Sequence, residues 1–225
     1  MSSARPVVFH PGLRLQNSCN SDCATEGPDM NKIVIVDHSG HGHIREVVET
    51  VAEGLGGALL GIDAEARVPE GAWEQLAAAD AIVFGPPTYM GTLSSQFKRF
   101  EDASSKAWYT QDWKKKLAAA FTDSASMKGE KLSTLHDLFT HSQQHSIFWF
   151  GPGILPIASK ATTRNDINYA ASFSGLMTAT PSGGSPDEMM PRDIATANKF
   201  DARIAEAVAK FASSPKSLPR GLAPE

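Results

Sequence analysis

The sequence has only two cysteines in 225 residues, Cys19 and Cys23, and both lie near its N-terminus. The remainder cannot form the disulfide framework that holds many small secreted domains together, so we expect a cytoplasmic protein. A Cys-x₃-Cys pair can bind a metal or become oxidised, but we expect no metal site in this stretch.

Long apolar runs and an excess of basic charge are also absent. No run approaches the length of a membrane span, so we expect no membrane insertion. The net charge is −4, which gives no electrostatic reason to expect binding to nucleic acid. A hydrophobic content of 41% and a charged content of 20% are ordinary for a globular domain.

Both ends of the chain differ in composition from its centre. Residues 1–29 are rich in Pro, Ser, Asn and Asp and lack a sustained apolar segment, which predicts a flexible leader rather than a signal peptide. Met30 stands directly before the first strand and could be the functional start. We expect one domain over residues 30–212 and a disordered polar tail over residues 213–225.

Short apolar runs alternate with helical patterns between these ends. Strands are expected at residues 32–37, 58–62, 81–85, 117–122 and 147–150. Five helices are expected between or after these strands. The first follows residue 44, where apolar residues have helical spacing, and the second has Pro69 in its first turn. Apolar residues mark the other three, which contain Leu93, Phe97 and Phe100, then Leu132, Leu135 and Phe139, and finally residues 192–211. This alternation predicts an α/β fold, a doubly wound five-stranded parallel sheet with helices on both faces.

Residues 151–190 interrupt this alternation of strands and helices. They show no clear periodicity and are too many for a plain connection, so we expect either a functional insertion or a partly mobile segment.

The first candidate for chemistry is the turn after the first strand, residues 38–43. Ligands of open parallel sheets bind beyond the carboxyl ends of the strands. Ser39 and two glycines before a helix N-terminus suit a phosphate. A P-loop is excluded because no Gly-Lys-Ser/Thr follows. A Rossmann dinucleotide loop stays open through Gly40, Gly42 and Asp63, although Arg45 occupies the third glycine position.

Two later loops also follow strands. Residues 86–92 combine prolines, Tyr89 and Gly91, which suits the edge of a flat heteroaromatic ring, although an ordinary proline-stiffened loop would look similar. Residues 122–129 offer backbone N–H groups and short hydroxyl side chains. No nucleophile with its own base and no paired carboxylates accompany these loops. This combination is typical of an enzyme whose cofactor carries the chemistry.

The histidines and two aromatic residues have competing interpretations. We do not expect His38, His41 and His43 to form a metal site. His141 and His145 have zinc-like i, i+4 spacing but lack the acid of an HExxH motif, and His145 could act as a cation at a helix end. The pair of Trp108 with Tyr109 is either a partly buried anchor or a stacking wall over a flat substrate.

Together these motifs resemble the flavodoxin-fold NAD(P)H:quinone oxidoreductases of the WrbA type, over roughly residues 32–211. The first loop is similar to the family's S-x-x-G-H-I pattern, and the second to its P-T-x-x-G segment. The remaining matches are residues 95–98, 121–124, 129–145 and 193–197.

The resemblance implies FMN as cofactor, NAD(P)H as electron donor, and two-electron reduction of a quinone-like acceptor by ping-pong hydride transfer. It implies that no side chain need be catalytic. The residues that it assigns to FMN are Ser39, His41, Gly42, His43, Ile44, Pro87, Thr88, Tyr89, Met90, Gly91, Thr122, Asp123, Ser124, Ala125, Gly129 and His145. It further implies that Trp108 lines the substrate side, and that a homotetramer or homodimer completes each site from neighbouring subunits.

Three residues depart from the family pattern. His38 replaces an aromatic or small residue, Asp123 an Asn or Ser, and Ala125 a Gly. An acid near the flavin would disfavour its anionic reduced form and lower its potential.

Three other functions stay open at this point. They are a flavodoxin-like electron carrier, an FMN-binding regulatory protein, and a Rossmann-type NAD(P) dehydrogenase. The modest negative charge and the long insertion argue against a carrier. The physiological acceptor and the choice between NADH and NADPH are not predicted.

Overall fold

The computed structural model divides the chain into two units, Met1–Met30 and Asn31–Glu225. Within the second unit it describes residues 32–39, 44–181 and 189–213. The expected leader with Cys19 and Cys23, residues 40–43 of the first loop and most of the expected tail lie outside the described residues.

A parallel sheet forms the centre of this unit, with strand order β2-β1-β3-β6-β7. Its strands are β1 (Ile33–Asp37), β2 (Ala58–Gly61), β3 (Ala81–Gly85), β6 (Leu117–Ser124) and β7 (Phe148–Trp149). Ile35 pairs with Leu59 on one side and with Val83 on the other, so β1 is central. The doubly wound fold that the alternation predicts is confirmed.

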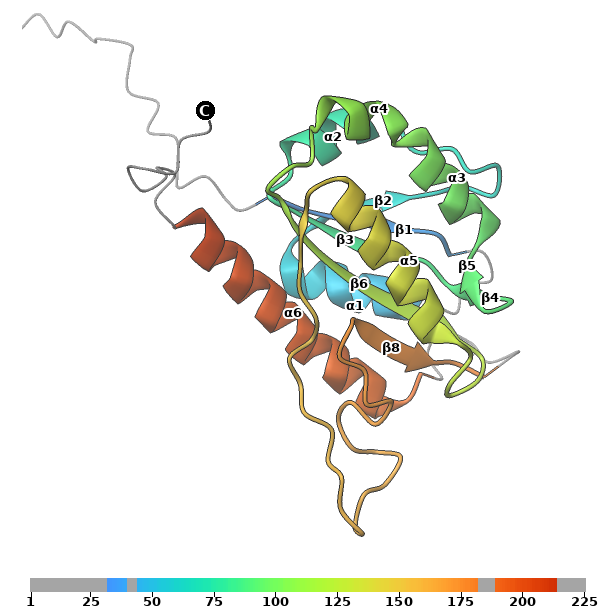
Figure 1. Ribbon diagram of the computed structural model, residues 1–225. Coiled ribbons are helices and arrows are strands. Elements are labelled where there is room, and N and C mark those ends of the chain that lie inside the picture. Colours follow the sequence, from blue (N-terminus) through green and yellow to red (C-terminus); the bar gives the residue numbers. More distant parts are fainter. Residues whose placement is uncertain (1–31, 40–43, 182–188, 214–225) are drawn as a thin grey trace, which may run out of the picture. The chain divides into compact units, whose positions relative to one another are not determined.

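Alternate residues of the strands point to opposite faces of the sheet, and each face has its own helices (Figure 1). One face packs against α2 (Ala72–Ala78), α3 (Ser95–Ala103) and α5 (Lys131–Gln144). The other face packs against α1 (Arg45–Leu55) and α6 (Pro191–Ala212). Two pairs of residues from β1 illustrate the alternation: Val34 and Val36 join the first core, and Ile33 and Ile35 join the second.

The fifth position of the sheet is shared by two short strands. β7 pairs with the first half of β6, and β8 (Leu176–Ala179) pairs in parallel with the second half, Phe121 opposite Leu176. β8 lies inside residues 151–190, where no element was expected. Part of that supposed insertion therefore continues the sheet.

Several expected helix details are wrong. Pro69 stands before α2 rather than in its first turn, and Leu93 belongs to β5 (Thr92–Leu93), since α3 begins after the N-cap Ser94. On α5, Leu132 and Phe139 are exposed, whereas Leu135 and Leu138 face the core.

Two small elements complete the described part. β4 (Thr88–Tyr89) pairs with β5 as a hairpin, and α4 (Ser105–Thr110) follows α3. Within the described residues, none of the helices combines the length and the apolar character needed to cross a bilayer.

Candidate active site

The described part of the first loop lies at the carboxyl end of β1. His38 is buried there, and the Ser39 hydroxyl is buried without a hydrogen-bond partner among the described residues. An unpartnered buried hydroxyl is costly unless a ligand satisfies it. Ile44 directs its side chain into the core, so only its backbone could meet a ligand. The expected contacts of His41, Gly42 and His43 lie outside the described residues.

The second loop forms a tight hairpin beyond β3. Pro86, Pro87 and Thr88 are buried, which fixes the start of the loop. Met90 and Gly91 both have positive φ angles, of 48° and 87°, as tight hairpin turns require. The Met90 side chain is fully exposed at the tip of the hairpin.

A buried cluster of threonine hydroxyls joins the second and third loops. The Thr88 hydroxyl lies 2.8 Å from that of Thr122 at the carboxyl end of β6, and 2.7 Å from that of Thr134 on α5. Each hydroxyl can donate one hydrogen bond and accept others, so Thr88 can satisfy both neighbours. The structure thus brings Thr88 and Thr122, two of the predicted site residues, into direct contact.

The third loop turns sharply from β6 into α5. A Cβ atom on Gly129 would lie 2.1 Å from the Ser124 hydroxyl, and Gly129 has a φ of 50°. Both the lack of space and the left-handed backbone therefore disfavour any residue other than glycine here. The Ser124 hydroxyl donates to the carbonyl of Ser126 at 3.0 Å. Ala125 is exposed on this loop.

Lys131 holds this loop from within, although it was not among the predicted site residues. Its side chain is fully buried, and its ammonium donates to the Ser124 hydroxyl at 3.0 Å and to the Ser126 carbonyl at 2.7 Å. Burial lowers its pKa to about 8, although the carboxylates of Asp123 and Asp193 act in the opposite direction. A lysine in the first turn of a helix opposes the helix dipole, and that was the available signal.

Asp123, the acid that departs from the family pattern, is buried beneath the same loop. Its Oδ1 accepts hydrogen bonds from Thr178 at 2.7 Å and Thr180 at 3.3 Å, both from the segment around β8. Burial raises its pKa to about 6, while the threonine hydroxyls and Lys131 counteract that rise. Asp123 is therefore mostly ionised at pH 7, with a cation close by.

A groove begins at the second loop and runs between α3 and α5. Its first hollow, of about 800 Å³, is bounded by Tyr89 and Met90 of the hairpin and extends to Glu101 and His141. A second hollow, of about 320 Å³, shares Glu101 and His141 and ends at Trp108 and His145. Trp108 is about half exposed, so it offers a ring face to whatever enters.

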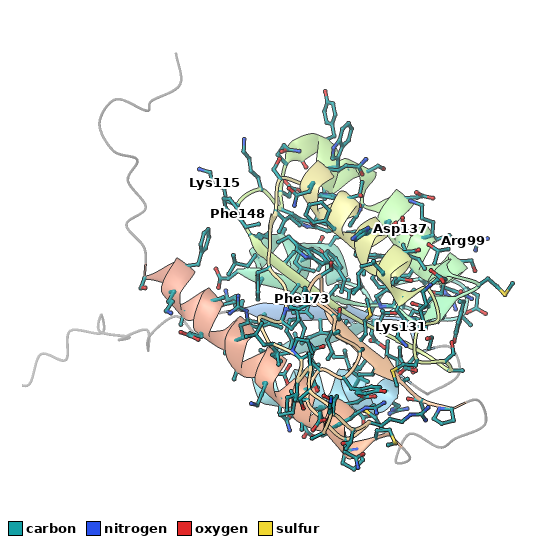
Figure 2. The ribbon with its side chains drawn as sticks, turned by 60° about the horizontal axis from the view of Figure 1, so that its bottom comes forward. Arg99, Lys115, Lys131, Asp137, Phe148 and Phe173 are labelled. Carbon is teal, nitrogen blue, oxygen red and sulfur yellow. The ribbon has the colours of Figure 1, made fainter. Side chains whose placement is uncertain are left out.

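His145 and Trp108 are not brought to the loops at the carboxyl end of the sheet. α5 has 14 residues, so about 20 Å of helix separates its start from its end. Figure 2 shows Lys131 towards one end of this unit and Lys115 and Phe148 towards the other, and the Lys115 N–H donates to the Ser146 carbonyl, next to His145.

The environment of His145 contradicts the interpretation as a helix-end cation. Its ring is buried, stacks on Trp113 at 4.3 Å between centroids, and has Nε2 3.0 Å from the Ser104 hydroxyl. Burial lowers the pKa of His145 to about 4, so it is neutral at pH 7. His141, whose ring centroid lies 4.6 Å from that of His145, has a pKa lowered to about 3, chiefly by burial.

The fold and this arrangement of loops define a flavodoxin-type class. The order 2-1-3-4-5 of its five sheet positions places a switch point between β1 and β3, and the first two loops flank it. The Ser39 hydroxyl, which is buried without a partner among the described residues, fits the phosphate of a cofactor such as FMN.

Comparison with known proteins agrees with this class. Residues 61–157 match the family model for NADPH-dependent FMN reductase. The chain is 38% identical to the flavodoxin FldP of Pseudomonas aeruginosa, over 78% of this chain and 96% of that protein. It is 31% identical to an NAD(P)H dehydrogenase (quinone) of Geotalea uraniireducens, over 80% of this chain and 99% of that protein.

A solved structure gives the same result. The flavodoxin, WrbA-like protein from Agrobacterium tumefaciens is 38% identical, with a TM-score of 0.65 over 80% of this chain and 99% of that chain. The chain belongs to the WrbA-type family of flavodoxin-fold, FMN-dependent NAD(P)H oxidoreductases. The Rossmann-type dehydrogenase that the first loop left open is thereby excluded.

Proposed function

We propose that this flavoprotein reduces a quinone-like small molecule by two electrons, with NAD(P)H as donor and ping-pong exchange of the two substrates. When bound, FMN supplies the hydride chemistry. In this proposal the first loop holds the phosphate through Ser39, His41, Gly42 and His43 and the backbone of Ile44. The ring lies against Pro87, Thr88, Tyr89, Met90 and Gly91 of the second loop and Thr122, Asp123, Ser124, Ala125 and Gly129 of the third.

The groove that starts at Tyr89 and Met90 carries this proposal. An electron carrier needs only an exposed cofactor edge, whereas a reductase needs space for a flat acceptor. The hollow of about 800 Å³ beside the hairpin is of the size that small-molecule sites have. The acceptor would enter beside the second loop, and the NAD(P)H nicotinamide would occupy the same place in alternation.

Trp108 and His145 enter the proposal through a neighbouring subunit. Since α5 separates them from the loops of their own chain, they would line the site of an adjacent copy in a homotetramer or homodimer. Light scattering coupled to size-exclusion chromatography tests this assembly. A fully active monomer would contradict the contribution of Trp108 and His145 to a neighbour.

The location of the protein is also part of the proposal. NAD(P)H is a cytoplasmic reductant, and the cysteine-free domain requires no oxidising compartment. We therefore propose a cytoplasmic enzyme that acts on a soluble acceptor.

The visible absorption spectrum tests the central claim. The purified protein is given FMN, desalted, and then treated without oxygen with NADPH or NADH. We expect a retained flavin band that bleaches completely in one step. A retained band that neither nucleotide bleaches would indicate an electron carrier or a regulatory protein, and the absence of retained flavin would refute the assignment.

A further inference from the structure

Glu101 occupies an unusual position in the groove between α3 and α5. It borders both hollows, yet its side chain is only 5% exposed. Its Oε2 pairs with the Lys98 ammonium at 3.2 Å, whereas its Oε1 is buried without a hydrogen-bond partner among the described residues. A buried carboxyl oxygen without a partner is costly, which is an indication that a ligand supplies one.

The two histidines of the groove are poor proton donors. The Ser104 hydroxyl donates its hydrogen bond to the backbone carbonyl of Glu101 at 2.6 Å. Because that hydroxyl has no second hydrogen to donate, the His145 Nε2 at 3.0 Å must be the protonated nitrogen, which donates to Ser104. Its Nδ1 is then a bare lone pair. His141 is neutral as well, because its pKa is lowered to about 3.

We propose that Glu101 is a catalytic residue of this protein, the acid that protonates the oxygen of a quinone-like acceptor bound in the groove between α3 and α5. This inference rests on the proposed function, which supplies the acceptor and the donor. It goes beyond the implication of the family resemblance that no side chain need be catalytic.

Conversion of a quinone to a hydroquinone adds one hydride and one proton. NAD(P)H supplies the hydride, with its two electrons, in the proposed function. The O–H bond of Glu101 breaks, an O–H bond forms on the quinone oxygen, the hydroquinone leaves, and water reprotonates the Glu101 carboxylate through the open groove.

The surroundings of Glu101 support this role. Burial raises its pKa to about 7, near the value that proton transfer at neutral pH favours. Lys98 on its own helix lowers that pKa, whereas Asp102 and, across the groove, Asp137 of α5 raise it. His141 and His145 also face this part of the groove and are neutral.

The test compares the wild type with Glu101→Gln, which keeps the shape of the side chain but removes its acid. FMN-loaded protein is reduced with dithionite, so that the measurement does not depend on NAD(P)H. It is then mixed in a stopped-flow instrument with 1,4-naphthoquinone or with ferricyanide, which accepts electrons without protons. Glu74→Gln on α2 is the matched control, because Glu74 is exposed and borders neither hollow.

We expect the wild-type quinone rate to fall as pH rises through about 7. Glu101→Gln should lower that rate on the order of 10²-fold at pH 6 and remove the pH dependence. The ferricyanide rate should be the same in all three proteins. A Glu101→Gln quinone rate equal to that of the wild type, or an equal loss with both acceptors, would overturn the proposal.

A second readout needs no turnover. The infrared carbonyl band of protonated Glu101 should titrate near pH 7 in the wild type and be absent from Glu101→Gln. A band that titrates near pH 4 would overturn the proposal. If dithionite-reduced protein shows the Glu101-dependent step but NAD(P)H fails to reduce it, this inference stands while the proposed function fails.

Discussion

The Thr88 hydroxyl lies 2.8 Å from the Thr122 hydroxyl, and this contact joins two loops that are 34 residues apart in sequence. Thr88 belongs to the loop after β3, and Thr122 to the end of β6. Since Thr134 of α5 bonds the same Thr88 hydroxyl at 2.7 Å, one buried cluster sets the spacing of both loops from the helix beneath them.

Thr122→Val should loosen this spacing. The substitution removes one hydroxyl from a buried cluster at nearly constant volume. We expect a loss of about 1 kcal/mol in the free energy of unfolding and a roughly five- to tenfold rise in the FMN dissociation constant. Urea unfolding and flavin fluorescence titration measure the two effects. Thr110→Val, on the exposed end of α4, should change neither quantity, and an unchanged FMN affinity in Thr122→Val would contradict the role of the cluster.

Lys131 should make FMN binding depend on pH. Because its pKa is lowered to about 8, its ammonium loses the proton as pH rises through that value, and its bonds to Ser124 and Ser126 weaken. We expect FMN to bind several-fold more weakly at pH 9 than at pH 7. Lys131→Met should bind weakly at both values. Lys128→Met, an exposed lysine of the same loop, should retain the wild-type profile; a pH-independent wild type would refute the prediction.

Lys98 should set the pH at which Glu101 acts. Its ammonium lies 3.2 Å from Glu101 Oε2 and lowers the pKa of that carboxyl. Lys98→Gln removes the charge, so the midpoint of the quinone-rate profile should move to higher pH. The stopped-flow profile checks the direction. A shift to lower pH would mean that Lys98 does not act on Glu101 through its charge.

Asp201 on α6 should destabilise the fold at alkaline pH. Its carboxyl is buried with neither oxygen hydrogen-bonded within the described region, and burial raises its pKa to about 7. The pKa of this carboxyl is 3.8 in the unfolded chain. Its contribution to the free energy of unfolding is therefore fully present below pH 3.8 and is lost as pH rises through about 7. Gly54 of α1 permits this burial, because a Cβ there would lie 2.6 Å from Asp201 Oδ2.

Asp201→Asn should therefore gain stability relative to the wild type between pH 5 and 8, by on the order of 2 kcal/mol. Chemical denaturation at both pH values measures the gain. Asp112→Asn, an exposed residue on the loop after α4, should show no such trend. A constant difference between Asp201→Asn and the wild type would show that Asp201 does not titrate in this range.

The sheet could be predicted from sequence because most of its strands are buried on both faces. Residues 33–36 and 81–84 are continuous apolar runs that end in polar or glycine-rich turns, as is typical of central parallel strands. β8 was missed because its four residues alternate between buried and half-buried and have no apolar run around them. Its position depends on pairing with β6, a long-range contact that local sequence does not encode.

The inward face of α5 does not follow from the apolar spacing that predicts the helix. Of the residues that marked it, Leu135 is buried, whereas Leu132 and Phe139 are 49% and 43% exposed, and Leu138 is buried in their place. All four lie on one broad apolar surface, and periodicity alone does not select the half that meets the sheet. The groove residues Glu101 and His141 were also beyond prediction, because two separate helices bring them together.

The split fifth strand has a consequence for the order of folding. β7 follows α5 directly, so it can pair with β6 after closing a short loop. β8 must first close the long excursion from residue 150 to residue 175, and longer loops cost more entropy and form later. Thr178 and Thr180 arrive with β8, so Asp123 gains its hydrogen bonds only after the remainder of the sheet exists. We expect the third loop to become ordered last, and the newly formed domain to be able to bind its cofactor only when that final segment is in place.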